Sequence, residues 1–323
     1  MTPTLTVLIA THDRAGLLER ALRYLNEAHR PEGWRIEILV AANACRDGTH
    51  ALLDGYVRDA SGLARLPLRW FPEPRVGKSH ALNSALALLA SDLVAFVDDD
   101  HRVDSAYFDS VCRAAAAYPD VDVFCGRILP DWDGSEPGWV HDTGRYRIYP
   151  LPVPRYDLGD RRLSSPQDTA APGGGNWVLR GALLARTGPF STEYGPVGRG
   201  LEGSEDMEWI LRAVHAGARV MYVPEIVQYH YVDPDRLTLG YLVRKAYQRS
   251  AGAVRLSGMT AGAGLIPAWM IRKVGSNALA LIRPGPRARF RFQLVRLAAT
   301  LGEVKGHLQA RRERDAKSGP ASQ

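Results

Sequence analysis

The sequence predicts an α/β fold, in which a mostly parallel sheet is flanked by helices and followed by a basic, helical C-terminal extension. Over the first hundred residues, apolar runs typical of strands buried on both faces alternate with segments of helical periodicity. Such alternation implies right-handed βαβ units. Charge also divides the chain: residues 236–323 hold 17 Lys and Arg against 3 Asp and Glu, a net charge of +14, whereas residues 1–235 have a net charge of −8.

The individual elements follow from the spacing of apolar residues. In the segment 15–28, for example, Leu18, Leu22 and Leu25 recur at helical intervals. The elements predicted for the first hundred residues are strand 5–10, helix 15–28, strand 36–42, helix 49–57, strand 68–73, helix 79–89 and strand 93–97. Polar clusters follow three of these strands, and parallel strands all end at one edge of a sheet, so we expect a ligand site at that edge.

The remaining residues show a weaker period. Seven prolines lie between positions 130 and 172, which predicts a long loop. A helix at 205–216 and a strand at 220–223 are expected to complete the acidic part of the chain. In the extension we predict a helix at 239–254, mixed structure at 256–282, an amphipathic helix after Pro286 and a frayed end over 311–323.

Composition limits the class of protein and its compartment. A chain of 323 residues with 46% apolar residues can bury the core of one large or two modest domains. The three cysteines are odd in number and form no Cys-x-x-Cys pair, which argues against a disulfide scaffold and favours a reducing compartment. No signal peptide or membrane-spanning segment is recognised. We therefore expect a cytoplasmic protein, either soluble or peripheral on the cytoplasmic face of a membrane.

Three adjacent carboxylates, Asp98, Asp99 and Asp100, follow the strand predicted at 93–97. Their mutual repulsion would make burial costly without a counter-charge. A hard divalent cation provides one, since Mg²⁺ and Mn²⁺ prefer carboxylate and phosphate oxygens. We interpret the cluster as a site for Mn²⁺ or Mg²⁺, with an exposed acidic turn or a helix N-cap as the alternative.

Two further polar motifs precede predicted helices. Arg75 and Lys78 flank Gly77, an arrangement that suits a diphosphate at a helix N-terminus, although the P-loop spacing is incomplete. Glu205 and Asp206 begin another helix, where they either complement the helix dipole or supply a general base. Both motifs have a structural alternative when taken alone.

Taken in order, these motifs resemble glycosyltransferase family 2, whose members have the GT-A fold. The resemblance covers residues 4–235. It rests on Val7–Arg14, Asn43–Thr49, Gly77–Asn83, Val97–Asp100, Gly175–Trp177, and Glu205 and Asp206 with Arg212 and Gly217 downstream.

The resemblance implies roles for individual residues. The implied nucleotide-sugar ligands are Thr11, Asp13, Arg14, Asn43, Asp47, Arg75, Lys78, Asp98 and Asp99. The implied metal ligands are Asp98, Asp100 and His230. The catalytic base would be Asp206, with Glu205 beside it. The acceptor side would include Gly175, Asn176 and Trp177.

The implied activity is metal-dependent transfer, with inversion, of a sugar from a nucleoside-diphosphate sugar to an acceptor hydroxyl. Family members often carry an acidic residue before Asn43, where this chain has Ala42, so GDP- and dTDP-sugars stay open beside UDP-sugars. A sugar-phosphate nucleotidyltransferase is one alternative, but the glycine-rich basic loop expected after its first strand is absent at 10–14. A non-catalytic nucleotide-sugar-binding protein is another, but it would not need the carboxylate cluster and Asp206 together.

We predict two domains. Residues 1–235 would form a GT-A catalytic domain, with a nucleotide-sugar-binding half at 1–110 and an acceptor half at 111–235 that includes loop 130–172 as a lid. Residues 236–323 would form the basic, helical extension, which meets an anionic membrane surface, the catalytic body or a second subunit in a homodimer. The hydroxyl acceptor would be lipid-linked or a polysaccharide. No nucleic-acid partner is expected, because no recognisable module accompanies the basic residues.

Overall fold

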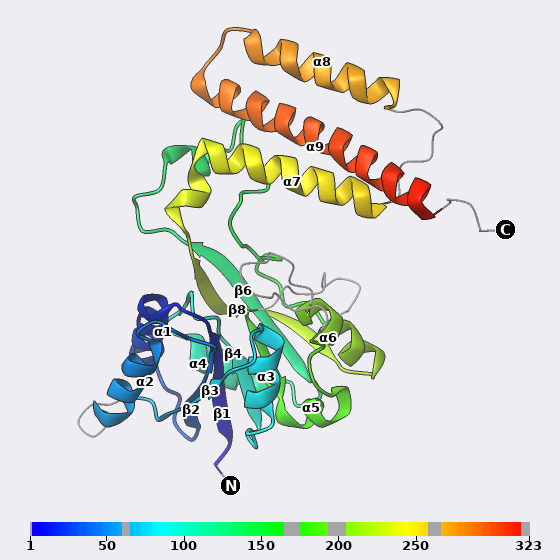
Figure 1. Cartoon of the computed structure of the whole chain (residues 1–323). Coiled ribbons are helices and arrows are strands. Elements are labelled where there is room, and N and C mark those ends of the chain that lie inside the picture. Colours follow the sequence, from blue (N-terminus) through cyan, green and yellow to red (C-terminus); the bar gives the residue numbers. More distant parts are fainter. Residues whose placement is uncertain (1, 60–64, 165–174, 193–204, 258–265, 318–323) are drawn as a thin grey trace, which may run out of the picture. The chain divides into compact units, whose positions relative to one another are not determined.

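The computed structural model in Figure 1 describes residues 2–59, 65–164, 175–192, 205–257 and 266–317. The chain divides into two compact units. The first consists of Met1–Asp131 and Pro154–Tyr231, and the second of Trp132–Val153 and Val232–Gln323. Part of the segment predicted to be a lid therefore belongs to the second unit, and its residues 165–172 lie outside the described residues. The predicted division into domains after residue 235 stays a prediction.

A mixed sheet forms the centre of the first unit (Figure 1). Its eight described strands have the order β3-β2-β1-β4-β7-β6-β8-β5. Only β5 and β7 run against the other described strands, so the sheet is mostly parallel, as predicted. The strands are β1 (Thr4–Thr11), β2 (Arg35–Asn43), β3 (Leu68–Glu73), β4 (Leu93–Phe96), β5 (His101–Val103), β6 (Val123–Asp131), β7 (Trp177–Arg180) and β8 (Val220–Tyr231).

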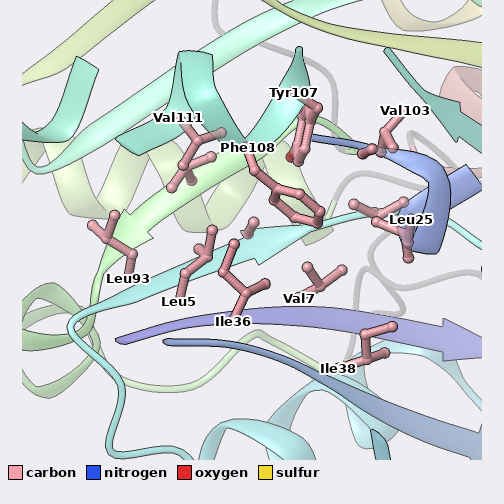
Figure 2. Packing of buried hydrophobic residues seen from close by; sticks show 14 of the residues in the cluster. Leu5, Val7, Leu25, Ile36, Ile38, Leu93, Val103, Tyr107, Phe108 and Val111 are labelled. Atoms are coloured by element: carbon pink, nitrogen blue, oxygen red, sulfur yellow. The ribbon is translucent and has the colours of Figure 1, made fainter. Parts of the chain in front are cut away.

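Helices pack on both faces of this sheet, and β1 contributes alternate side chains to two apolar cores. Leu5 lies in one cluster with Leu25 and Phe108 (Figure 2), whereas Leu8 lies in another with Trp209. Full burial of a side chain of this size contributes about 1.5–3 kcal/mol, so both cores hold β1 in its register. The described helices of this unit are α1 (Ala15–Glu27), α2 (Thr49–Arg58), α3 (Lys78–Leu86), α4 (Tyr107–Ala117), α5 (Gly181–Thr187) and α6 (Glu205–His215).

The pairing of the strands brings distant polar residues to one edge of the sheet. In the parallel register of β1 and β2, Thr11 lies opposite Ala42, and β4 is parallel to β1 on its other side. The loops that follow these three strands therefore meet at their shared carboxyl edge. At the end of the strand order opposite β3, β8 and β5 are antiparallel neighbours, and His101 lies opposite His230.

The predicted end of the strand at residue 223 is wrong, because β8 continues to Tyr231. Pro224 suggests an end to the strand, since proline cannot donate a ladder hydrogen bond. The partner strand β6 accommodates the interruption with a shift in register between Cys125 and Arg127, after which pairing resumes. As a result His230 lies on the strand rather than after it.

The second unit is helical. Its elements are η2 (Gly138–His141), η3 (Pro234–Leu237), α7 (Leu239–Ser257), α8 (Ala268–Ile282) and α9 (Arg287–Lys317). Two glycines allow α9 to lie directly on α7: a Cβ at Gly302 would stand 2.1 Å from the carbonyl oxygen of Tyr247, and one at Gly306 would stand 2.3 Å from that of Ala251. None of the described helices is both long and apolar enough to cross a lipid bilayer.

The extension is more helical than predicted. The segment expected to be mixed contains α8, and α9 continues to Lys317 although fraying was expected from 311. Helix α9 extends beyond its regular apolar pattern because it still packs against the unit there: Ala310 is buried. Arg291 of α9 pairs with Asp142 (Nη2 to Oδ2, 2.9 Å) and lies over the Trp139 ring. These contacts explain why the segment Trp132–Val153 belongs to this unit.

Candidate functional site

A cavity of about 320 Å³ opens at the carboxyl edge of β1, β2 and β4. Several residues predicted to bind a nucleotide sugar or a metal line it, together with others that were not singled out. The lining residues are Ala10, Thr11, His12, Arg14, Asn43, Val76, Gly77, Lys78, Asp98, Asp99, Asp100 and His230. The sheet therefore gathers into one cavity motifs that are spread over more than two hundred positions of the sequence.

Thr11 and Arg14 donate hydrogen bonds to Asp99, the middle residue of the carboxylate cluster. The Thr11 hydroxyl donates to Asp99 Oδ2 at 2.7 Å, and Arg14 Nη1 lies 3.0 Å from both Asp99 Oδ1 and Asp100 Oδ2. Burial, reinforced by the neighbouring charge of Asp100, raises the pKa of Asp99 to about 6. The loop that follows β1 thus supplies a positive charge to the adjacent carboxylates.

Lys78 connects two of the predicted motifs. Its Nζ lies 3.1 Å from Asp98 Oδ1 and 3.7 Å from Asp206 Oδ2. Burial alone would lower the pKa of Lys78, but Asp206 and Asp98 raise it well above its ordinary value. The lysine is therefore a fixed cation between the end of β4 and the start of α6.

Glu205 and Asp206 differ in exposure although they are neighbours on α6. Glu205 is 2% exposed, and its Oε2 has no hydrogen-bond partner among the described residues. The Asp206 side chain is 20% exposed. Burial raises the pKa of both carboxyl groups, while the charge of Lys78 opposes the increase. Asp206 is therefore the more accessible of the two to solvent.

Asp100, His101 and His230 form a candidate metal centre. One ligand atom from each lies within 4.8 Å of the other two. His230 Nε2 lies 3.6 Å from Asp100 Oδ2, and His101 Nε2 lies 3.9 Å from both Asp98 Oδ2 and Asp100 Oδ1. A carboxylate and two imidazoles at these separations suit a divalent transition metal. His101 is absent from the predicted ligand set, and its position directly after Asp100 is the signal that could have identified it.

The backbone at Gly175 packs closely against this centre. Its φ of +112° belongs to a region that glycine favours. A Cβ there would stand 2.8 Å from Asp98 Oδ2 and 2.9 Å from the Cε1 atom of His101. The glycine therefore lets the backbone approach the two side chains closely.

Asp13 and Asp47 shape the loops beside the cavity rather than line it. Asp13 Oδ1 accepts from the backbone N–H of Arg46 at 2.6 Å and of Asp47 at 3.2 Å. Asp47 in turn accepts from the backbone of Ala15 and Thr49 at the starts of two helices. Their geometry provides a structural role for both carboxylates.

Asn43 and Arg75 lie on the adjacent loop. Asn43 holds it by donating to the Arg75 carbonyl at 2.6 Å and accepting from the Gly77 N–H at 2.9 Å. The Arg75 guanidinium is paired with Glu73 (2.8 Å) and donates to Ser84, so it does not line the cavity. Of the two predicted diphosphate cations on this loop, Lys78 is the one that faces the cavity.

The predicted acceptor-side residues are buried. Asn176 and Trp177 are each 1% exposed. Trp177 packs in the core beside Trp209 and Phe96. In this structure neither side chain presents a surface to a second substrate, and their predicted role on the acceptor side stays a prediction.

Comparison with known proteins identifies the family. The model of "Glycosyl transferase family 2" matches residues 6–185. The chain belongs to glycosyltransferase family 2. Among curated proteins, the succinoglycan biosynthesis protein ExoM of Rhizobium meliloti is 26% identical over 315 residues, which cover 93% of this chain and 91% of ExoM. The pre-mycofactocin glycosyltransferase of Mycobacterium tuberculosis is 26% identical over 62% of this chain and 41% of its own length.

Solved structures agree on the fold. The mannosyltransferase PcManGT from Pyrobaculum calidifontis, in complex with GDP-Man and Mn²⁺, matches 99% of this chain and 77% of its own, with a TM-score of 0.51 and 19% identity. Residues 1–349 of S. aureus TarS with UDP-GlcNAc match 96% of this chain and 92% of that one, with a TM-score of 0.53 and 16% identity. The predicted GT-A fold and glycosyltransferase class, of the hexosyltransferase type and with a nucleotide-sugar donor, are confirmed. The roles of single residues stay predictions.

Proposed function

We propose that this glycosyltransferase is metal-dependent and inverting, and that Asp206 is its general base. The observation that carries the proposal is the pair of contacts made by Lys78, which places Asp206 beside Asp98 and the carboxylate cluster. A single displacement needs this arrangement, with a cation at the leaving group and a base at the attacking hydroxyl. Asp206 would accept the acceptor's proton as its oxygen attacks the anomeric carbon of the donor.

Asp206 has the environment that a general base requires. Burial raises the pKa of its carboxyl group, which brings it closer to the working pH. The charge of Lys78 opposes this rise in pKa, and the lysine would itself face the diphosphate. Charge that develops on the departing nucleoside diphosphate would be stabilised by this lysine and by Arg14.

We propose Mn²⁺ as the metal, held by Asp100, His101 and His230. When bound, a divalent ion supplies Lewis-acid stabilisation of the diphosphate. The imidazoles favour a transition metal over Mg²⁺, which prefers an all-oxygen site. Burial lowers the pKa of His230, although Asp100 opposes the change, so its ring is available as a neutral ligand. The solved structures of two proteins with a similar fold, PcManGT and GalNAc-T7, contain Mn²⁺.

A thermal-shift screen tests the donor class. UDP-, GDP- and dTDP-sugars are each added with and without Mn²⁺, and a donor at about 100 times its Kd should stabilise the protein by about 2.7 kcal/mol. At least one of them should raise the melting temperature more with Mn²⁺ than without it. A protein that responds to none of them, with or without Mn²⁺, would contradict a donor from these three classes.

For the second unit we propose an anionic membrane surface as partner. Helix α8 exposes several large apolar side chains: Ile271 by 60%, Leu279 by 51% and Ile282 by 77%. Ordinary surface helices place polar residues at such exposed positions. Residues 236–302 contain twelve Lys and Arg and no Asp or Glu. This charge favours an anionic lipid surface and opposes a second copy of the same face, and it suits a lipid-linked acceptor.

Vesicle flotation tests this partner. Ile271→Asp combined with Leu279→Asp should weaken binding to vesicles rich in phosphatidylglycerol by about tenfold or more for each residue, because burial of such a side chain contributes about 1.5–3 kcal/mol. Leu88→Asp is the matched control, since Leu88 lies in the first unit and is 54% exposed. If the wild-type protein does not float, or dimerises through the same residues, the membrane proposal is wrong.

A further inference from the structure

His101 makes one short hydrogen bond on the side of its ring that faces the protein interior. Its Nδ1 lies 2.6 Å from Gln228 Oε1, and the two residues are 3% and 0% exposed. The other ring nitrogen, Nε2, faces the carboxylates of Asp98 and Asp100. Which nitrogen carries the proton decides whether His101 can bind a metal through Nε2, since a ligating nitrogen needs a free lone pair.

The orientation of the Gln228 amide is determined by its other neighbours. Gln228 Nε2 lies 3.0 Å from the backbone carbonyl oxygen of Phe96, which can only accept a hydrogen bond. The amide nitrogen must therefore be on that side, and the amide oxygen must be on the side of His101. Since Oε1 can only accept, Nδ1 of His101 is the donor.

Asn176 supports the same assignment independently. Its Nδ2 donates to two backbone carbonyls, those of Arg127 at 2.9 Å and Ile226 at 3.0 Å. Its Oδ1 therefore points to the Gln228 amide nitrogen, which donates to it at 2.9 Å. Backbone carbonyls thus fix the orientation of the Asn176 amide, and Asn176 and Phe96 together fix that of the Gln228 amide. Gln228 in turn orients the ring of His101.

We propose that Gln228 is a positioning residue for the metal: it holds the proton of neutral His101 on Nδ1 and leaves the Nε2 lone pair for the cation. This inference rests on the proposed metal dependence and explains how His101 is kept in the form that can bind the metal. Without Gln228 the ring could place its proton on Nε2, where it would donate to Asp98 or Asp100. The metal would then compete with that proton for the same atom.

A spectroscopic measurement tests the assignment without a variant. Protein labelled with ¹⁵N at histidine is studied by long-range ¹H–¹⁵N correlation in the absence of metal, above the ordinary histidine pKa of about 6.5, and His101→Gln identifies the signal. The proposal predicts that the ring of His101 is protonated at Nδ1. A ring protonated at Nε2 would overturn it.

The affinity for Mn²⁺ provides a second readout, measured from the electron paramagnetic resonance signal of the free ion. Gln228→Met retains the approximate volume but removes the acceptor, so Mn²⁺ should bind about 10- to 100-fold more weakly and the His101 proton should no longer be confined to Nδ1. Tyr107→Phe is the matched control. It removes the Tyr107 hydroxyl that lies 3.0 Å from the same amide nitrogen, but leaves Phe96 O and Asn176 Oδ1 for its two hydrogens.

The outcomes separate this inference from the proposed function. If wild-type protein binds Mn²⁺ and Gln228→Met binds it equally well, Gln228 does not position the ligand, although the enzyme is still metal-dependent. If the ring is protonated at Nδ1 but Mn²⁺ does not bind to the wild-type protein, the metal centre itself is wrong. Weaker binding in Gln228→Met with unchanged binding in Tyr107→Phe supports the positioning role over a general loss of structure.

Discussion

Asp206→Asn is expected to reduce the turnover number by about 10²- to 10⁴-fold while the affinity for the donor changes little. The asparagine amide has nearly the same shape but cannot accept the acceptor's proton. Donor binding should persist because Asp206 does not line the cavity, which Arg14, Lys78 and Asp98 provide. Steady-state kinetics for donor and acceptor, with a thermal-shift measurement of donor binding, would separate the two effects.

Asp120→Asn is the control for this substitution. Asp120 lies in the same unit and its side chain is 80% exposed, so its variant should retain full turnover. The pH profile adds a second criterion. Burial raises the pKa of Asp206, so the ionised base is present above this raised pKa and is lost as the pH falls through it. The acid limb of wild-type turnover should therefore lie above the ordinary aspartate range of about 3.9. Unchanged turnover in Asp206→Asn would exclude Asp206 as the base.

Asp100→Ala is expected to remove the metal-dependent part of donor binding and to lower turnover by about 100-fold or more, a larger loss than the 10- to 100-fold typical of outer-shell residues. Asp100 is the carboxylate of the candidate metal centre, and its side chain is 12% exposed. Its removal leaves the two imidazoles without the one carboxylate of the centre, while the nearby Asp98 is already paired with Lys78.

Donor affinity measured with and without Mn²⁺ checks this variant. Asp120→Ala serves as its matched control, and the melting temperature without metal shows whether the variant is folded. The expected pattern is a wild-type donor affinity that rises with Mn²⁺ and a variant affinity that does not respond to it. A wild-type response in Asp100→Ala would show that the ion, if any, binds elsewhere.

The first half of the fold could be predicted from the sequence because its strands are buried on both faces. Continuous apolar runs then mark their positions, and β1, β2 and β3 lie within a residue of the predicted bounds. The carboxyl edge follows from parallel strands alone. Most of the cavity lining was therefore predictable: Thr11 and Asn43 end their strands, and the carboxylate cluster follows β4.

Other parts of the site depend on pairing between distant strands, which the sequence does not display. His101 and His230 meet only because β5 and β8 pair across 129 positions of the chain. Gln228 reads as an ordinary strand residue, and its role depends on a backbone carbonyl at Phe96. Arg75 is a residue that the sequence pattern overstates. Its position near Lys78 suggests a phosphate ligand, but its guanidinium is paired with Glu73 and does not line the cavity.

Calorimetric titration with UDP, GDP and dTDP, each with and without Mn²⁺, tests most directly the claim that the cavity at the carboxyl edge binds the diphosphate of a donor through a metal. One of the three diphosphates should bind in a 1:1 complex whose affinity increases when Mn²⁺ is present. Binding that is equally tight without the ion, or no binding of any diphosphate, would contradict the account.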